Sequence, residues 1–480
     1  MTESSINNSF ASETIDYWYT IKGSFTPEQF GVFLNMHSQS VEENYLVHFH
    51  ECFHYWQSIF TPYGHLKWGC YRTVSSEIIE LWLKATKETP TERVIPAGSL
   101  LPCKSMEQLT NVAQIFLQDY ASKIISLEER VYYDDAIKNI LPISLDDICP
   151  IVKIRGKDYR LNGIDILESF AKFQEATLAY IVEGRPINST IEIEYLNPEY
   201  YSSLYFFVMT IGWDRIIEFP ILCELALASD ELCIFDNAHD WKRNHPAWRF
   251  VKMVELVSAD KNIHPLKYES IKEDFLSYSE DVLKTCGYKS QCDSWNSAIA
   301  YGSQNELSIS KDMLRAINFK KDYPWILSFP FIDKEIMLEI KKFQPYFCIT
   351  SDSTIYFVDN ESLGNEVIFE NQYQALAHQI RGNMSLRCLD RGKLQCGFSY
   401  YGLNECQYQK SGECDGHIDR FHQLPKVKIN DDGTIIEGCP FELFLSLMDI
   451  SIKDIKITDV KKKIDYRLLA ENAKQLKGIS

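Results

Sequence analysis

Apolar residues recur at helical spacing through much of the first 260 residues. The clearest case is the segment 41–60, where apolar positions follow one another at intervals of three and four residues, namely Leu46, Phe49, Phe53, Trp56 and Phe60. This spacing predicts a helix that buries one stripe of side chains. The following Thr61-Pro62-Tyr63-Gly64 predicts its end. Similar patterns predict helices over 74–86, 105–140, 164–182, 199–212, 219–229 and 246–258.

Strand signals are fewer and shorter. Tyr17–Ile21 is aromatic and β-branched, and 152–161 reads as a hairpin that turns at Arg155-Gly156-Lys157. Beyond residue 260 the pattern loosens, and a second strand pair, 346–350 and 355–358, precedes a helix near 371–381. Another hairpin is expected at Asp431-Asp432-Gly433, followed by a short helix after Cys439-Pro440. Together these elements predict an α+β fold that is predominantly helical.

Charge and composition exclude several classes of protein. The chain of 480 residues has 49 basic and 67 acidic residues and a formal charge of −18, so it repels phosphate backbones and we expect no nucleic-acid partner. No apolar run is long enough to cross a membrane. The amino terminus has neither the basic nor the apolar segment of a secretion signal, so we expect a cytoplasmic protein. Its 14 cysteines are therefore interpreted as thiols or metal ligands rather than disulfides.

The predicted helix 41–60 contains His50-Glu51-Cys52-Phe53-His54, an HExxH motif. Residues four apart on a helix share a face, so both imidazoles can reach one metal ion, while Glu51 points aside and can contact a metal-bound water. With 11 histidines in the chain, chance predicts on the order of 0.02 such motifs. The alternatives are a helix whose histidines bind neighbouring carbonyls, or a metal site without catalysis.

A catalytic zinc site needs a third protein ligand and one open position. A histidine six residues after His54 would make a metzincin, but Phe60 occupies that position. Metzincin chemistry is therefore excluded, and a glutamate becomes the better third ligand.

The segment Glu168-Ser169-Phe170-Ala171-Lys172-Phe173-Gln174-Glu175 resembles the second zinc-binding helix of gluzincin peptidases of the aminopeptidase-N-like type, whose pattern is N-E-G-F-A-x-[YF]-x-E. The resemblance implies a zincin-like domain with zinc held by His50, His54 and Glu168. It departs from the family in having Leu167 in place of the asparagine and a link of 113 residues after His54. Glu77 and Glu80 lie closer to the usual spacing and remain alternative ligands.

Glu175 lies on the same helical face as Glu168, two turns further on, and is expected to hydrogen-bond a ligating histidine from outside. In the resulting site a catalytic Zn²⁺ activates a water for attack on a carbonyl, and Glu51 acts as general base. The oxyanion needs a further donor, and Tyr55 and Tyr180 are candidates.

The leading function is therefore a zinc-dependent hydrolase, most simply a peptidase with a peptide or protein substrate. A second hypothesis is a non-catalytic interaction or scaffold protein with a relict metal site. A third is a di-iron carboxylate protein, since Glu51 and His54 have the ExxH spacing. No other histidine follows a glutamate at that spacing.

The cysteine-rich end suggests a second metal. Glycines and turns surround four cysteines that can hold a structural Zn²⁺, Cys396, Cys406, Cys414 and Cys439. An iron–sulfur cluster or plain thiols are the alternatives. The predicted organisation is a zincin-like domain over 1–260 with a helical insertion at about 62–150, a mixed region over 261–385, and a cysteine-rich region over 386–480. The C-terminal half is a candidate surface for a protein partner.

Overall fold

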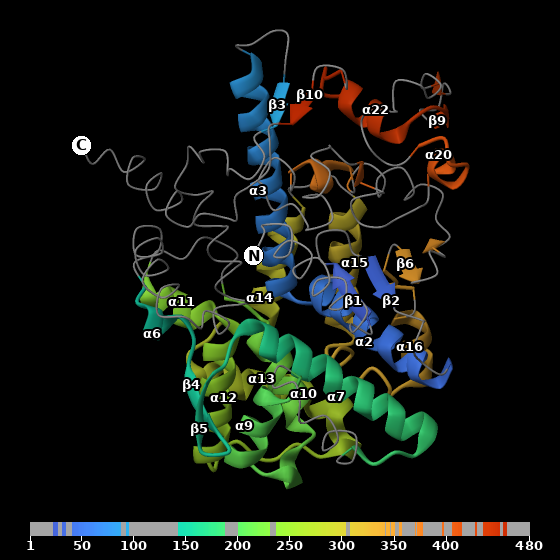
Figure 1. Ribbon diagram of the computed structural model, residues 1–480. Helices are drawn as coiled ribbons and strands as arrows, with labels where there is room; N and C mark the ends of the chain where they lie inside the picture. Colours follow the sequence, from blue (N-terminus) through green and yellow to red (C-terminus); the bar gives the residue numbers. More distant parts are fainter. Residues whose placement is uncertain are drawn as a thin grey trace, which may run out of the picture. The chain divides into compact units, whose positions relative to one another are not determined.

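A computed structural model provides the structure of the chain, and Figure 1 shows it in ribbon form. It describes residues 23–26, 31–34, 41–87, 93–95, 143–187, 200–230, 237–303, 308–340, 342–345, 347–350, 355–357, 370, 372–377, 396–397, 406–414, 428–429, 435–451 and 455–457. The predicted strand 17–21 and the predicted helix 105–140 lie outside these residues.

The chain forms two compact units, each discontinuous in sequence. Unit 1 comprises Met1–Asn44, Arg72–Gln108 and Pro345–Ser480, and unit 2 comprises Tyr45–Tyr71 and Leu109–Gln344. The predicted division at residues 260 and 385 stays a prediction.

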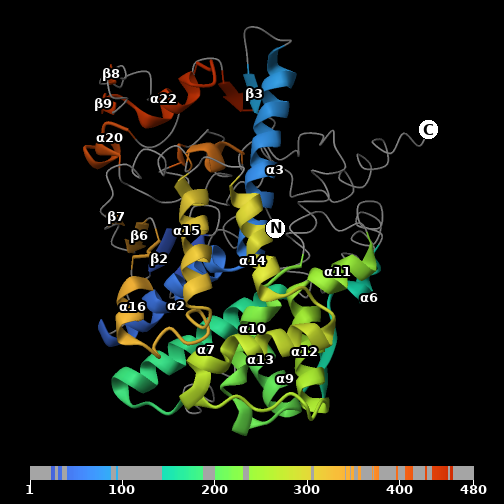
Figure 2. The ribbon, with the colours of Figure 1, turned by 180° about the vertical axis from the view of Figure 1, so that it is seen from behind.

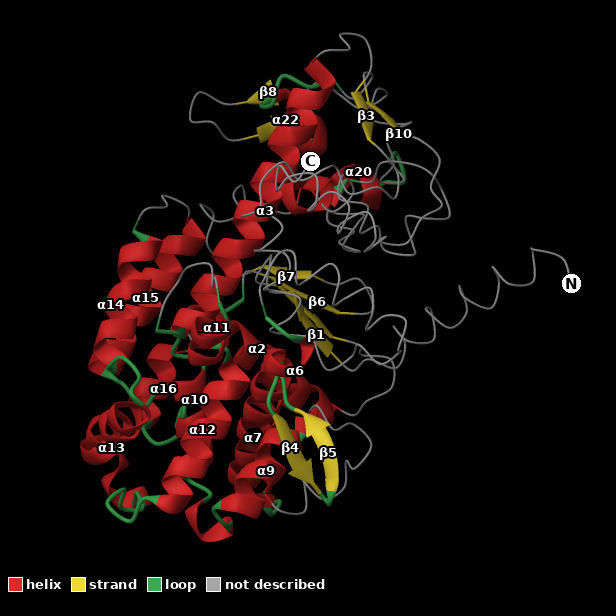
Figure 3. Ribbon diagram, turned by 90° about the vertical axis from the view of Figure 1, so that its left-hand side faces the viewer, coloured by secondary structure: helices red, strands yellow, loops and turns green. Residues whose placement is uncertain are grey.

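Unit 2 is predominantly helical in its described part, as Figure 3 shows. Its described strands are the hairpin β4 (Ile151–Ile154) and β5 (Lys157–Arg160). Its α-helices are α2 (Val41–Phe60, from Tyr45 on), the start of α3 (Pro62–Lys87), α6 (Leu145–Ile148), α7 (Gly163–Glu183), α9 (Ser202–Thr210), α10 (Glu218–Ala226), α11 (Ala238–Asn244), α12 (Pro246–Ala259), α13 (Ile271–Cys286), α14 (Gln291–Gly302), α15 (Ser308–Asp322) and α16 (Lys334–Ile340). Two 3₁₀ turns, η3 (Trp213–Arg215) and η4 (Tyr268–Ser270), complete the described part of this unit.

The corner between α2 and α3 forms where the sequence predicts the end of the first helix. Thr61 accepts a hydrogen bond from the Gly64 amide at 3.1 Å and donates one to the Gln57 carbonyl at 2.6 Å, so it bridges the two helix ends. A Cβ atom on Gly64 would lie 2.2 Å from the Ser58 carbonyl oxygen, so the close approach requires glycine. The helix predicted over 74–86 is the later part of α3, which begins twelve residues earlier, at Pro62.

A buried lysine holds the C-terminal end of α2. The Lys320 ammonium donates to the Phe60 carbonyl at 3.0 Å and pairs with Glu224 at 2.8 Å. A cation is favourable at a helix C-terminus because the last carbonyls carry partial negative charge. This contact therefore fixes the end of the helix that carries the HExxH motif.

The start of α7 is defined by a capping box. The Asn162 side chain accepts from the Asp165 amide at 3.1 Å, and the Asp165 carboxylate accepts from the Asn162 amide at 2.8 Å. The Tyr159 hydroxyl on β5 also donates to Asp165 at 2.8 Å, which joins the hairpin to the helix. The hairpin turns at Arg155 and Gly156, both with positive φ, as the sequence predicts. The sequence-predicted helix to residue 182 is confirmed.

The apolar side of α7 packs against α2 and against the helices that follow. Phe170 meets Phe53 of α2 with ring centroids 4.9 Å apart, and both side chains are fully buried. Phe173 meets Phe219 of α10 at 5.3 Å. Burying an aromatic side chain stabilises a fold by roughly 2–3 kcal/mol, so these pairs decide which face of α7 is turned toward α2.

The described part of unit 2 after residue 260 contains four α-helices, α13, α14, α15 and α16, none of which was predicted from the sequence. In the structure α13 packs against α12, and α14 runs beside α15, as Figure 2 shows. The predicted helices 199–212, 219–229 and 246–258 correspond to α9, α10 and α12. The buried positions of α13, Ile271, Phe275, Tyr278 and Val282, follow one another at helical spacing, so the sequence does contain the signal for this helix.

Unit 1 contains the described four-stranded sheet, in the order β1-β2-β6-β7. Its strands are β1 (Gly23–Thr26), β2 (Gly31–Leu34), β6 (Phe347–Thr350) and β7 (Ile355–Phe357), and β2 and β6 are parallel while the outer pairs are antiparallel. Smaller pairs are β3 (Arg93–Ile95) with β10 (Ile455–Ile457), and β8 (Lys428–Ile429) with β9 (Ile435–Glu437). The described helices include the rest of α3, residues 372–377, α20 (Gln407–Lys410) and α22 (Pro440–Ser446). The structure confirms the strand pairs predicted around 351–353 and 431–433 and the helix predicted after Pro440.

No helix in the described ranges combines the length and the apolar character needed to span a membrane.

Replacing Asn162 by alanine should lower the free energy of unfolding by about 1–2 kcal/mol, because the buried capping box at the start of α7 is lost. Urea denaturation of the full chain measures the change. Asn237→Ala, which removes the exposed cap of α11, is the matched control and should cost about 0.5 kcal/mol. An Asn162→Ala midpoint equal to wild type would contradict the role assigned to the cap.

Candidate metal centre

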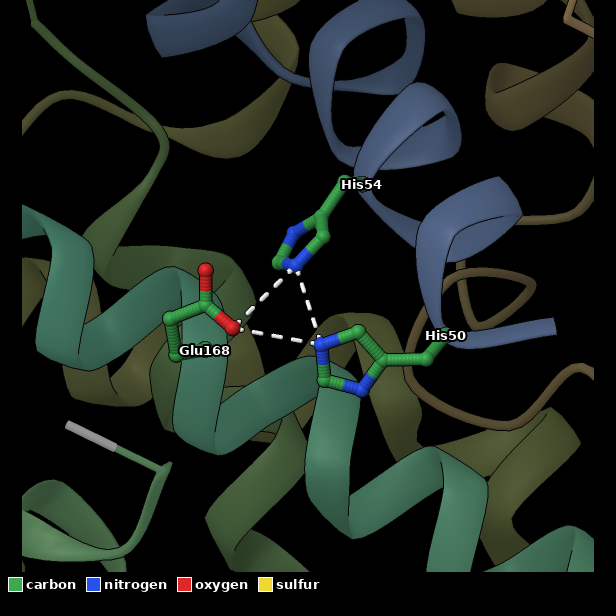
Figure 4. Close-up of side chains that lie close together, drawn as sticks. All are labelled: His50, His54 and Glu168. Carbon is green, nitrogen blue, oxygen red and sulfur yellow. Dashed lines mark hydrogen bonds and ion pairs between the residues drawn. The ribbon is translucent and has the colours of Figure 1, made fainter. Parts of the chain in front are cut away.

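Three side chains from two helices converge in unit 2. His50 and His54 project from α2 and Glu168 from α7, with their ligand atoms turned toward one another (Figure 4). The two Nε2 atoms are 3.1 Å apart, and the Glu168 Oε2 atom lies 3.2 Å from His50 Nε2 and 3.3 Å from His54 Nε2. The sequence prediction that one turn of helix presents both imidazoles to a single point is confirmed.

These three distances fit a divalent cation. When ligand atoms lie about 2.0–2.1 Å from zinc at tetrahedral angles, two of them are about 3.3 Å apart. The observed triangle, with sides of 3.1, 3.2 and 3.3 Å, has nearly these dimensions. Two nitrogens and one carboxylate oxygen are also the donor set of catalytic zinc, which keeps a fourth position free. The group can hold a metal ion.

The remaining ring nitrogens of the histidines have different partners. His50 Nδ1 faces Glu175 Oε2 at 3.0 Å, and the other oxygen of Glu175 accepts from the Lys172 ammonium at 2.8 Å. His54 Nδ1 faces the side-chain oxygen of Gln57 at 2.8 Å. Such outer hydrogen bonds orient ligating imidazoles and raise their basicity. The predicted contact between Glu175 and a histidine is therefore present.

The buried charges of the centre shift one another's titration. Burial alone would lower the pKa of His50, but its hydrogen bonds to Glu168 and Glu175 raise that pKa to about 10. Burial opposes ionisation of Glu168, yet the two histidines hold its pKa well below the usual range. The pKa of Glu175 is also lowered, against its burial, by His50 and Lys172. The metal-free centre therefore holds a proton on His50 at neutral pH.

Glu51 is buried beside the triad without belonging to it. Its side chain is 7% exposed, and desolvation raises its pKa to about 7, although the neighbouring histidines oppose that shift. Among the residues with described positions, the close group of ligand atoms comprises His50, His54 and Glu168 and leaves Glu51 out. In the metal-free chain, burial therefore gives the Glu51 carboxyl a pKa above its ordinary value.

The competing glutamates are placed differently. Glu80 is exposed on the part of α3 that belongs to unit 1, whereas His50 and His54 belong to unit 2. The side chain of Glu77 lies outside the described residues. Of the glutamates considered from the sequence, the structure brings Glu168 to the two histidines.

Two residues that contact the histidines, Tyr200 and Gln57, were not predicted from the sequence. The ring of Tyr200 lies across the ring of His50, with centroids 5.7 Å apart, whereas the predicted oxyanion donor Tyr180 is 55% exposed. Tyr55 is buried, and burial together with Asp312 raises its pKa. Gln57 was detectable as a polar residue three positions after His54, but nothing local marks Tyr200.

The four C-terminal cysteines belong to unit 1. Cys396, Cys414 and Cys439 are buried, and Cys406 is partly exposed. Burial, helped by the nearby thiols of Cys406 and Cys414, raises the pKa of Cys439 to about 12. In the part of the chain that is described, the group close enough to share a metal is the His50/His54/Glu168 triad. The second, structural zinc stays a prediction.

Comparisons with protein-family models, curated proteins and solved structures find no match to this chain. The class of the site is therefore defined by its geometry, a His-His-Glu centre that can hold a metal ion.

The apparent affinity for Zn²⁺ should rise about tenfold per pH unit between about pH 6 and pH 8, because binding must displace the proton held on His50, whose pKa of about 10 lies above this range. Competition with a chromophoric chelator, corrected for the chelator's own protonation, measures this slope. An affinity that is constant over the range would contradict a protonated His50.

Zinc content should distinguish the two predicted sites. His54→Ala should remove about one equivalent per chain, since it deletes one of the three ligands. A zinc that remains in that variant and is lost in Cys414→Ser would belong to the cysteines. Elemental analysis of the purified full-length variants measures the zinc content of each. Unchanged zinc in Cys414→Ser would contradict the cysteine site.

Proposed function

We propose that unit 2 is a zinc-dependent hydrolase, and most specifically a peptidase. The observation that carries the proposal is the triangle of His50, His54 and Glu168 with the buried carboxyl of Glu51 one residue from the first ligand. When bound there, Zn²⁺ supplies a Lewis acid for a substrate carbonyl and lowers the pKa of a water molecule to about 7.

The residues of the chain divide the remaining tasks. His50, His54 and Glu168 hold the ion, and Glu175 and Gln57 orient the two imidazoles. Glu51 is the buried carboxyl group beside the three ligands, and as the general base it takes up a proton from the attacking water and can pass it to the leaving amine.

The exposed side of the centre indicates the direction of access. The side chains of Glu168 and His54 are 18% and 11% exposed, against 6% for His50. Glu168 is therefore the most exposed of the three side chains and His50 the most buried, whereas Glu175, the carboxylate partner of His50, is 11% exposed. We expect a peptide bond to approach from the side of Glu168.

The proposed zinc site is, more specifically, of the gluzincin type. Its support is the arrangement of ligands on two helices, with HExxH on α2 and the third ligand, Glu168, on α7. The second carboxylate of the motif, Glu175, meets the outer nitrogen of His50. A di-iron centre would need a second ExxH pair, so the single triangle favours a mononuclear site.

Replacing Glu51 by glutamine should abolish peptide hydrolysis and leave the bound zinc in place, because the change removes the base but none of the three ligands. Loss of a general base costs about 10²–10⁴-fold in rate. Turnover of a mixed peptide library by the zinc-loaded full chain, with zinc content measured in parallel, tests this.

Glu255→Gln, on the exposed surface of α12, is the control and should retain both zinc and turnover. Wild-type turnover by Glu51→Gln would refute the assignment of the base. Zinc binding by the wild type with no turnover of any peptide would favour the scaffold reading instead.

A further inference from the structure

Gln57 occupies a buried position between the two helices that form the metal centre. It lies on α2, three residues after His54, and is 1% exposed. Its side-chain oxygen is 2.8 Å from His54 Nδ1, and its nitrogen is 2.9 Å from the Leu167 carbonyl oxygen on α7. Leu167 directly precedes the ligand Glu168, so Gln57 contacts the supports of two ligands.

The hydrogen-bonding partners of the Gln57 side chain determine the orientation of its amide group. A backbone carbonyl only accepts hydrogen bonds, so the amide nitrogen of Gln57 must face Leu167. The amide oxygen then faces His54. An amide oxygen also only accepts, and His54 Nδ1 must therefore carry the proton.

The proton on Nδ1 decides what the opposite nitrogen can do. A neutral imidazole has one N–H and one lone pair, so the tautomer with its proton on Nδ1 carries on Nε2 the lone pair that a metal ion needs. That atom lies 3.1 Å from His50 Nε2 and 3.3 Å from Glu168 Oε2, at the corner of the triangle. The opposite tautomer would place a hydrogen where the metal ion belongs.

We infer that Gln57 is a positioning residue that holds His54 in its metal-binding tautomer and ties it to the backbone that carries Glu168. The two histidines are thus oriented by different kinds of partner. His50 contacts the charged pair of Glu175 and Lys172, whereas His54 contacts a neutral amide that is hydrogen-bonded to α7. The inference rests on the metal site of the proposed function and does not require hydrolysis.

Gln57→Leu removes both hydrogen bonds at nearly the same size and should weaken Zn²⁺ binding about 10–100-fold, the usual effect of losing an outer partner of a ligand. Gln57→Glu restores an acceptor for His54 Nδ1 but no donor for Leu167. It should therefore lose less Zn²⁺ affinity than Gln57→Leu, because His54 keeps its hydrogen-bond acceptor. Competition titrations on the full-length variants measure these affinities.

Gln174 provides a matched control on α7. It is also 1% exposed, and its side-chain nitrogen donates to a backbone carbonyl, that of Ser328, at 2.8 Å. Gln174→Leu should therefore lower the free energy of unfolding about as much as Gln57→Leu while leaving the Zn²⁺ affinity at the wild-type value. Urea denaturation of the metal-free variants reads the stability.

Nitrogen-15 NMR of the metal-free chain reads the tautomer directly, with the His54 signals identified by their loss in His54→Gln. At a pH where the ring is neutral, Nδ1 should be protonated in wild type and a mixture of tautomers should appear in Gln57→Leu. A protonated Nε2 in wild type would overturn the inference, even if no metal bound at all. Equal zinc affinities for wild type and Gln57→Leu, or equal losses in Gln57→Glu and Gln57→Leu, would overturn it as well.

Discussion

The packing of α7 against α2 is the constraint on which the metal centre depends. One turn of helix supplies two imidazoles whose Nε2 atoms are 3.1 Å apart, but two ligands do not hold a catalytic ion. The third ligand is 118 residues from His50 and reaches it because Phe170 and Phe53 bury their rings against each other. Because the triangle joins two helices, the aromatic core of unit 2 sets the geometry of the site.

The buried charges of the centre are compatible with a bound cation. Glu168 and Glu175 are both held ionised in a buried setting, and the Lys172 ammonium pairs with only one of them. In the metal-free chain the second negative charge is matched by the proton on His50. A divalent ion can replace that proton, since metal ligands must be deprotonated and binding releases protons. Burial of these carboxylates is therefore stabilised by either a proton or a metal.

Rigid supports surround the ligands on both helices. The Lys320 ammonium holds the last carbonyl of α2, and the capping box of Asn162 and Asp165 fixes the first turn of α7. Outer hydrogen bonds then orient each imidazole. Sites held by helices with locked side chains keep their geometry better than sites on loops, because the ligands cannot relax away when the ion is absent.

The sequence by itself determined the local features of this protein. It predicted α2 and α7, the hairpin before α7, and the shared face of His50 and His54, because helical and strand periodicities depend only on neighbouring residues. Tertiary structure decided the choice of Glu168 over Glu80, the partner of Glu175 and the positions of Gln57 and Tyr200. These contacts join residues that are more than a hundred positions apart. Which helix faces meet follows from the packing of the whole core, and no local spacing records it.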